Sequence, residues 1–126
     1  MVRVRRAESS EIETVLAILD AAVLETDPDA VRRSISADRT LVAVEDDRIL
    51  GALIARPADP GVRIDAIAVR KRRQDQRIGT ALVEHLLDHH GRVVAEFDER
   101  VRPFYESLSF EISEREAGRY RGFRTV

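Results

Sequence analysis

Apolar residues recur along this chain with two different periods, and the change between them divides the chain into helices and strands. From Glu11 to about Leu24 the apolar positions have helical spacing: Ile12, Val15, Leu16, Ile18, Leu19 and Val23. Ser10 and Glu13 have the spacing of a capping box, which predicts that this helix begins beside them. A second, shorter helix is expected from Asp27 to about Ser36, because Pro28 is tolerated at the first position of a helix.

Seven short runs rich in β-branched and aromatic residues predict strands. They are Val2–Arg5, Thr40–Glu45, Ile49–Arg56, Val62–Val69, Val93–Phe97, Phe110–Arg115 and Tyr120–Val126. Asp46-Asp47-Arg48 and the turn residues of Pro57–Gly61 join the second, third and fourth runs into a meander. The last two runs predict a closing hairpin.

A third helix is predicted from Gly79 to about His90, ended by Gly91. A short fourth helix is predicted at Phe104–Leu108, after Pro103. The third helix joins two strands, so this unit should be a right-handed βαβ crossover with parallel strands. We therefore predict an α/β fold with a mixed, mostly antiparallel central sheet of about six to seven strands, helices on both faces and one parallel βαβ unit.

Composition excludes several classes of function. The 126 residues predict a single domain, 1–126, because domains commonly contain about 100 to 150 residues. The absence of cysteine excludes disulfides, thiolate metal sites and a cysteine nucleophile. No apolar run approaches the roughly 18 residues of a membrane span, and the N-terminus lacks the apolar stretch of a signal peptide. We therefore expect a cytoplasmic protein with no membrane partner. Because the net charge of −2 is spread along the chain, we expect no nucleic-acid partner.

A basic loop before the third helix carries the clearest local chemistry. The segment Arg70-Lys71-Arg72-Arg73-Gln74-Asp75-Gln76-Arg77 precedes Gly79. A helix N-terminus attracts anions through unpaired amides and its dipole, and glycine lets the backbone approach a ligand closely. A pyrophosphate would suit this site; the alternative is a solvated basic loop before an ordinary helix. The segment lacks the Gly-Lys-Ser/Thr of a P-loop and the several glycines of a dinucleotide fingerprint.

Two segments carry a family resemblance. In the first, a strand ending at Val69 leads through Gln74 and Gly79 into a helix. The second is Asp98-Glu99-Arg100-Val101-Arg102-Pro103-Phe104-Tyr105, followed by Leu108-Ser109-Phe110. The first resembles the central motif Arg/Gln-x-x-Gly-x-Gly/Ala of the GNAT superfamily of acyl-CoA-dependent N-acetyltransferases, and the second its Asn-x-x-Ala-x-x-Phe-Tyr motif with a closing Gly-Phe. The order of elements is similar over nearly the whole chain, which implies a GNAT-like fold.

The resemblance implies that acetyl-CoA binds as acyl donor. Main-chain groups of Ile67, Ala68 and Val69 would pair with its pantetheine arm. The pyrophosphate would be held by amides of the segment Gln74, Asp75, Gln76, Arg77, Ile78, Gly79 and Thr80. Tyr105 matches the family tyrosine near the thioester sulfur, where a phenol can protonate the departing thiolate. The alternative for Tyr105 is an aromatic residue of the core.

Acetyl transfer to an amine also requires a base that takes a proton from the ammonium group. Asp65 is the first candidate, because it has the same parity along its strand as Arg63, Ile67 and Val69, and the resemblance implies bases on this strand face. The alternative is a surface aspartate paired with Arg63 or Arg56.

The other titratable groups are weaker candidates. Glu96, late in the strand Val93–Phe97, is the second candidate base. His85 lies within the third helix, with His89 and His90 at its end, where a histidine cation suits the helix dipole. We expect structural roles for the three histidines and no metal site.

Four residues depart from the family motifs. Arg77 occupies the position of the first glycine, so its side chain must point away from the phosphates or bind them with its guanidinium. Lys71 stands where proline is common, and Ser109 where glycine usually ends the helix. Asp98 stands at the CoA-binding position where asparagine is common, and its carboxylate would repel the phosphates unless it is neutralised.

Two functions from different classes follow. The first is an acyl-CoA-dependent N-acyltransferase that transfers acetyl from acetyl-CoA to a primary amine in a ternary complex. The second is a non-catalytic GNAT-fold module that binds acyl-CoA or a protein partner. Convergence of Tyr105 and Asp65 on one cleft favours the first, whereas Tyr105 in the core with Arg77 filling the pyrophosphate site favours the second.

The acceptor pocket is expected between the first two helices and the loops near Pro57 and Gly118. It would contain acids and arginines together: Glu25, Asp27, Asp29, Arg32, Arg33 and Arg119. Such a mixture would suit a polyamine, an amino acid or a protein N-terminus. The closing hairpin makes a homodimer a further expectation.

Overall fold

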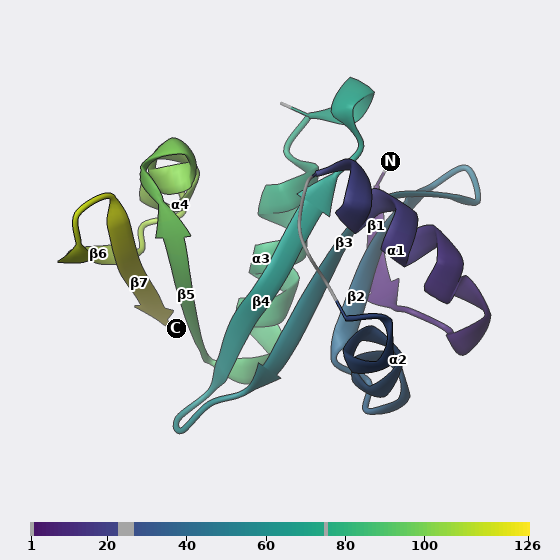
Figure 1. Cartoon of the computed structure of the whole chain (residues 1–126), viewed down its shortest axis with the longest axis horizontal. Coiled ribbons are helices and arrows are strands. Elements are labelled where there is room, and N and C mark those ends of the chain that lie inside the picture. The colour runs from purple at the N-terminus through teal and green to yellow at the C-terminus, as the bar shows by residue number, and fades with distance from the viewer. Residues whose placement is uncertain (1, 23–26, 75) are drawn as a thin grey trace.

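The computed structural model describes residues 2–22, 27–74 and 76–126 (Figure 1). Its strands are β1 (Arg3–Arg6), β2 (Thr40–Glu45), β3 (Arg48–Pro57), β4 (Val62–Val69), β5 (Arg92–Asp98), β6 (Glu111–Glu116) and β7 (Arg119–Thr125). Its α-helices are α1 (Ile12–Ala21), α2 (Pro28–Ser36), α3 (Ile78–His90) and α4 (Arg102–Ser107). Within these described ranges, no helix is both long and apolar enough to cross a membrane.

The strands form one mixed sheet in the order β1-β2-β3-β4-β5-β7-β6. Only β4 and β5 pair in parallel, and α3 connects them; every other neighbouring pair is antiparallel. This arrangement confirms the predicted α/β fold with its parallel unit. In the closing hairpin it is β7 that pairs with β5, which leaves β6 at the edge of the sheet.

Helices cover both faces of the sheet, and each face has its own core (Figure 1). On one face α1 and α2 bury Val15, Leu19 and Ile35 against the sheet. On the other, α3 and α4 bury residues such as Leu82 and Tyr105. Because β2 and β3 lie between the two cores, nearly all of their residues are buried, which explains their continuous apolar sequences.

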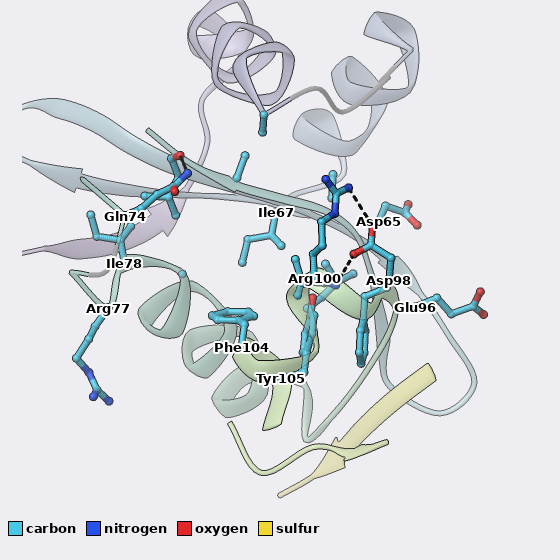
Figure 2. Close-up of a pocket in the computed structure, with 18 of the residues that line it drawn as sticks. Asp65, Ile67, Gln74, Arg77, Ile78, Glu96, Asp98, Arg100, Phe104 and Tyr105 are labelled. Carbon is cyan, nitrogen blue, oxygen red and sulfur yellow. Dashed lines mark hydrogen bonds and ion pairs between the residues drawn. The ribbon is translucent and has the colours of Figure 1, made fainter. Parts of the chain in front are cut away.

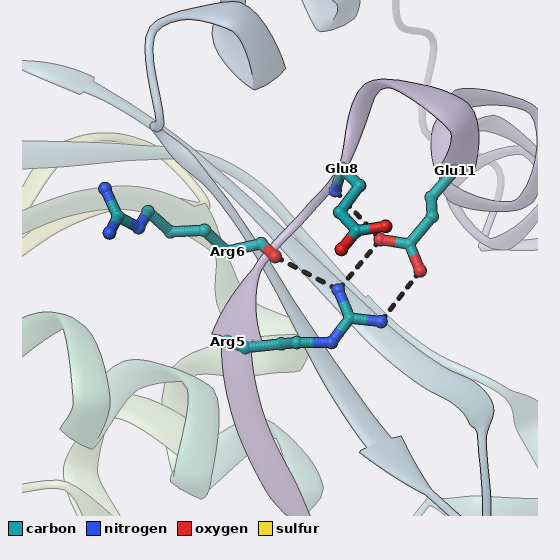
Figure 3. Close-up of polar contacts among 4 residues, drawn as sticks. All are labelled: Arg5, Arg6, Glu8 and Glu11. Carbon is teal, nitrogen blue, oxygen red and sulfur yellow. Dashed lines mark hydrogen bonds and ion pairs between the residues drawn. The ribbon is translucent and has the colours of Figure 1, made fainter.

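The start of α1 differs from the prediction. The Glu11 carboxylate accepts the backbone N–H of Glu8 at 2.8 Å, so the capping box predicted at Ser10 and Glu13 is wrong. The reason lies in a distant contact. The Arg5 guanidinium on β1 donates two hydrogen bonds, at 2.9 and 2.8 Å, to the same carboxylate (Figure 3). This bidentate pair orients Glu11 and ties β1 to the start of α1.

The ends of the other helices follow their local sequence. The Asp27 carboxylate accepts the N–H of Asp29 at 3.0 Å and caps α2. Gly91 ends α3 with φ of +73°, in the left-handed region that glycine adopts without strain. Helix α1 ends at Ala21, and the last two residues of its predicted range, 23 and 24, lie outside the described residues.

Candidate functional site

A cleft opens where β4 and β5 separate. The two strands pair over only three residues each, Val62–Ile64 with Val93–Ala95. Beyond this pairing the two strands diverge (Figure 1). A cavity of 770 Å³ lies between them, and Figure 2 shows residues that line it. Its walls come from the second half of β4, the start of α3, the end of β5 and α4, and it reaches the end of α1 at Ala22. The cleft thus gathers the elements that carry both sequence motifs.

The second half of β4 presents backbone groups to this cleft. The N–H of Arg70 donates to the carbonyl of Leu50 on β3 at 2.8 Å. Because every second residue of an antiparallel strand points its N–H and C=O toward the partner, Ala68 also faces β3. The backbone groups of Ile67 and Val69 face the opposite side, which β5 leaves open. Of the three residues expected to pair with pantetheine, these two have backbone groups on the open side.

The N-terminus of α3 lies at one end of the cleft. Its first backbone hydrogen bond runs from the N–H of Ala81 to the carbonyl of Arg77, at 3.0 Å. The amides of Ile78, Gly79 and Thr80 therefore lie outside the hydrogen-bond ladder of the helix. The dipole of this 13-residue helix adds positive potential at the same point. The arrangement suits an anionic ligand.

Several side chains of the basic loop before α3 form hydrogen bonds within the loop or to neighbouring strands. Arg70 donates through Nε to a backbone carbonyl of β3 at 2.8 Å. Arg73 binds a carboxylate of β2 and the side chain of Gln76. Gln74 donates through its amide to the carbonyl of the last β4 residue at 3.3 Å. Asp75, also expected at the pyrophosphate, lies outside the described residues.

Two residues that stand in place of family glycines keep a glycine-like backbone. Arg77, immediately before α3, has φ of +63° and ψ of +20°, and Ser109, just after α4, has φ of +62°. This left-handed region costs a residue with a Cβ about 1–2 kcal/mol. Figure 2 shows the Arg77 side chain directed away from Ile67 and Tyr105. The loop geometry therefore persists, and the Arg77 side chain does not fill the cleft.

Tyr105 combines a buried ring with a place on the cleft wall. The ring stacks on Phe97 at 4.4 Å between centroids and meets Phe104 and Phe110 edge-on at 5.0 and 5.1 Å. Phe104 in turn contacts the first turn of α3, where a Cβ on Gly79 would lie 3.3 Å from its ring. Tyr105 is 3% exposed, and this burial raises the pKa of its phenol well above the usual value. It still lines the cleft, so packing presents a neutral phenol to any ligand there (Figure 2).

Asp65 is the extra residue of a β-bulge. A register shift in the pairing of β3 with β4 leaves it without a partner on β3. Ile64 before the bulge and Ile67 after it pack against the same core, although a regular strand would place them on opposite faces. The predicted common face of Asp65, Arg63, Ile67 and Val69 is therefore wrong, because the bulge reverses the alternation between them.

Both candidate bases line the cleft, and each is paired with an arginine. Asp65 Oδ1 lies 3.0 Å from Nε of Arg56, and Glu96 Oε2 lies 3.4 Å from a terminal nitrogen of Arg63. Their side chains are 36% and 35% exposed, so both carboxylates can be reached from the cleft or from solvent. The salt bridge to Arg56 is one of the alternatives open for Asp65, and the same residue also shares the cleft with Tyr105.

Arg100 neutralises the carboxylate that replaces the usual asparagine. Asp98 accepts the backbone N–H of Arg100 at 3.0 Å and its guanidinium at 3.1 Å (Figure 2). This guanidinium holds the pKa of Asp98 below its usual range. Both residues line the cleft. Arg100 had no predicted role, although the Asp-x-Arg spacing before a helix was the available signal.

The histidines lie apart from the cleft. The rings of His85 and His89 stack on α3 with centroids 4.2 Å apart, and none of the three histidines lines the cavity. In the part of the chain that the structure describes, no group of three or more histidine, aspartate or glutamate side chains could hold a metal ion.

A second cavity, of 310 Å³, adjoins the first at Asp65 and Ala66. It lies between α2 and strands β3 and β4, and it includes Asp27 and Arg33 of the expected acceptor pocket. Other expected residues lie elsewhere. Asp29 and Arg32 pair with each other at 3.0 Å and do not line this cavity, while Arg119 lines the first cleft. Residue 25 lies outside the described residues.

These features are those of a GNAT-class domain. A family profile described as an acetyltransferase (GNAT) domain matches residues 36–112, a range that contains β4, α3, β5 and α4. The chain therefore belongs to the GNAT superfamily, as the two motifs predict. None of the curated protein sequences compared with the chain matches it significantly.

Solved structures of low sequence identity share the fold. Rv2747 from Mycobacterium tuberculosis, in complex with CoA and NLQ, is 18% identical with a TM-score of 0.83 over 98% of this chain and 99% of that one. The ribosomal-protein-S18-alanine N-acetyltransferase of Escherichia coli is 17% identical, with a TM-score of 0.79 over 98% and 91%. Diaminobutyrate acetyltransferase EctA of Paenibacillus lautus, in complex with L-2,4-diaminobutyric acid and CoA, is 14% identical, with a TM-score of 0.77 over 99% and 95%.

Proposed function

We propose that this chain is an acetyl-CoA-dependent N-acetyltransferase that acetylates a primary amine by direct attack in a ternary complex. The observation that carries the proposal is the convergence on one cleft of an open β4 edge, the N-terminus of α3, and the side chains of Tyr105 and Asp65. The described complexes of Rv2747 and EctA with CoA support the choice of donor, because those proteins share this fold.

The residues of the cleft fit the parts of acetyl-CoA in order. The backbone groups of Ile67 and the N–H of Val69 would pair with the pantetheine amides like an added strand, whereas the Val69 carbonyl already accepts the Gln74 amide. The amides of Ile78, Gly79 and Thr80 would bind the pyrophosphate at the positive end of the α3 dipole. The Asp98–Arg100 pair limits repulsion between the Asp98 carboxylate and the phosphates.

Acetyl-CoA supplies an activated carbonyl and a thiolate leaving group. Asp65 or Glu96 would accept the proton that the ammonium group loses before its nitrogen attacks, directly or through water. A β4 amide would donate a hydrogen bond to the carbonyl oxygen as it gains negative charge. As the amide forms, the nitrogen loses a second proton, which the departing thiolate takes up directly or through water. Because burial raises the pKa of Tyr105, its phenol keeps its own proton and would stabilise the departing sulfur by a hydrogen bond. Positioning of the two substrates would supply much of the rate.

One observation favours the non-catalytic alternative. Both candidate bases already pair with arginines, so an incoming ammonium group must compete with Arg56 or Arg63 for a carboxylate. A module that binds acyl-CoA without turnover would tolerate these ion pairs.

Calorimetric titration with acetyl-CoA and CoA, followed by thiol release over a panel of amines, distinguishes the two functions. We expect micromolar binding, and thiol release that falls about a hundredfold in Tyr105→Phe. Tyr120→Phe is the matched control, because its hydroxyl binds Glu99 and the residue does not line the cleft. Binding without release from any amine would support the non-catalytic module that binds acyl-CoA. Absence of binding would refute the transferase and leave only the module that binds a protein partner.

A further inference from the structure

The second cavity offers a place for the part of the acceptor that does not react. It meets the cleft at Asp65, so a molecule whose amine lies beside Asp65 would extend into it. At 310 Å³ it is at the small end of the range for ligand sites, which runs from about 300 to 1,000 Å³. A compact acceptor suits this volume better than a folded protein surface.

The charges on the wall of this cavity are unequal. Three arginines, Arg33, Arg39 and Arg56, face two carboxylates, Asp27 and Asp65. Arg56 is paired with Asp65 at 3.0 Å, and Asp27 accepts a backbone N–H of α2. Neither Arg33 nor Arg39 has a side-chain hydrogen bond or ion pair among the described residues.

Arg39 has an unsatisfied buried donor. Its Nε is inaccessible to solvent and has no hydrogen-bond partner among the described residues. Its position is fixed, because its carbonyl accepts the N–H of Ala55 on β3 at 2.9 Å and its own N–H donates to Ser34 on α2 at 2.8 Å. The Nε itself is closed to a ligand, but Arg39 lines the cavity and no ion pair among the described residues holds its guanidinium, so the group is available to an anion there. Guanidinium groups are well matched to carboxylates, which they can bind through two parallel hydrogen bonds.

We propose that Arg33 and Arg39 bind the carboxylate of the acceptor, so that the acceptor is a free amino acid whose amine lies beside Asp65. This inference rests on the proposed transferase function. A polyamine would place a second positive charge beside these arginines. A protein N-terminus carries an amide where an amino acid has its carboxylate, so it would leave both guanidinium groups unpaired.

The test compares acceptors that differ only by a carboxylate: lysine with cadaverine, 2,4-diaminobutyrate with 1,3-diaminopropane, and phenylalanine with phenethylamine. Thiol release from acetyl-CoA should favour an amino acid over its decarboxylated partner by about tenfold or more in kcat/KM. Arg33→Gln and Arg39→Gln should each reduce this ratio. Arg32→Gln is the matched control, because Arg32 lies on the same helix but pairs with Asp29 outside the cavity.

A binding experiment separates this inference from the transferase proposal. The same compounds are titrated into the CoA-saturated protein, and binding is followed by NMR chemical shifts, with thermal unfolding checking that each variant is folded. Amino acids that bind through Arg33 without thiol release would support the carboxylate site and refute the transferase. Decarboxylated amines that react as well as amino acids, or a preference that persists in both arginine variants, would overturn the carboxylate site alone. If no compound binds or reacts, the carboxylate site is refuted. The titration with CoA then decides whether the protein binds the proposed donor.

Discussion

Replacement of Arg77 by glycine tests the backbone strain at the start of α3. Arg77 holds φ at +63° and ψ at +20°, which costs a residue with a Cβ about 1–2 kcal/mol. Glycine avoids that cost, but its greater conformational entropy in the unfolded chain offsets about 0.4–1 kcal/mol of the gain in stability. Arg77→Gly should therefore raise the free energy of unfolding by about 0.5–1 kcal/mol. For a domain of this length that is a rise in Tm of about 2–4 °C.

Arg77→Ala is the matched control for this prediction. It removes the same exposed guanidinium but keeps the Cβ, so it should leave Tm within about 1 °C of the parent protein. Thermal and urea unfolding, followed by circular dichroism, measure both variants. Calorimetry with CoA then measures the contribution of the Arg77 charge to binding. Because both variants lose the same cation, their affinity for CoA should fall by a similar factor, and this factor should be smaller at high salt.

Two results would refute the reasoning about strain. Equal changes of Tm in Arg77→Gly and Arg77→Ala would mean that the lost guanidinium, and not the backbone, determines the effect. A lower Tm in Arg77→Gly than in Arg77→Ala would mean that the left-handed conformation carries no strain in this loop.

Three further predictions follow from contacts described above. Arg5 holds the pKa of Glu11 below its usual value, so this pair stabilises the fold above the ordinary glutamate pKa of about 4.3, and the stabilisation is lost as pH falls through the lowered value. Glu11→Gln should lower the free energy of unfolding by about 1 kcal/mol at pH 7 and make stability less dependent on pH in acid denaturation. An unchanged pH dependence would contradict this. Gly122→Val should lower the free energy of unfolding by about 1–3 kcal/mol in urea titrations, because even a Cβ there lies 3.1 Å from the Phe97 ring; parent-like stability would show that the aromatic cluster can yield. Asp98→Asn keeps an oxygen that can cap the following turn but removes a negative charge from the cleft, so calorimetry should find CoA binding up to about fivefold tighter; weaker binding would mean that the Asp98–Arg100 pair itself holds the ligand.

Much of the fold was predictable because local pattern and tertiary structure agree. The helical spacing of the apolar residues before Gly91 and the two flanking strands specify the parallel unit, and every strand bound lies within one residue of the expected one. The start of α1 lies within one residue of the predicted Glu11, but its capping contact was not predictable from the helix sequence alone. Glu11 is oriented by Arg5, which lies on another element and is six residues distant.

The site was less predictable than the fold, because its decisive features depend on more than one strand. Counting parity along β4 alone places Asp65 with Ile67, but the bulge appears only when the register with β3 is known. Arg39, which we propose as a carboxylate-binding residue, lies just before β2. It lines the same cavity as residues of β4 only because the folded sheet brings the two segments together. The motifs do locate the cleft, since the residues of both lie on its walls.

The sheet divides this protein into two halves whose cavities meet at Asp65 and Ala66. Residues expected to contact the acyl donor lie with α3 and α4 over one core, whereas the cavity proposed for the acceptor lies under α2 over the other. Substitutions distant from each other and without shared partners have nearly additive effects. New acceptor preferences can therefore arise by replacing residues of α2 and the β2–β3 end of the sheet, while the half that handles the donor keeps its sequence. In the proposed enzyme, the layered architecture would let much of the acceptor site vary while the donor site keeps its sequence, and the two sites would remain coupled at Asp65, which lines both cavities.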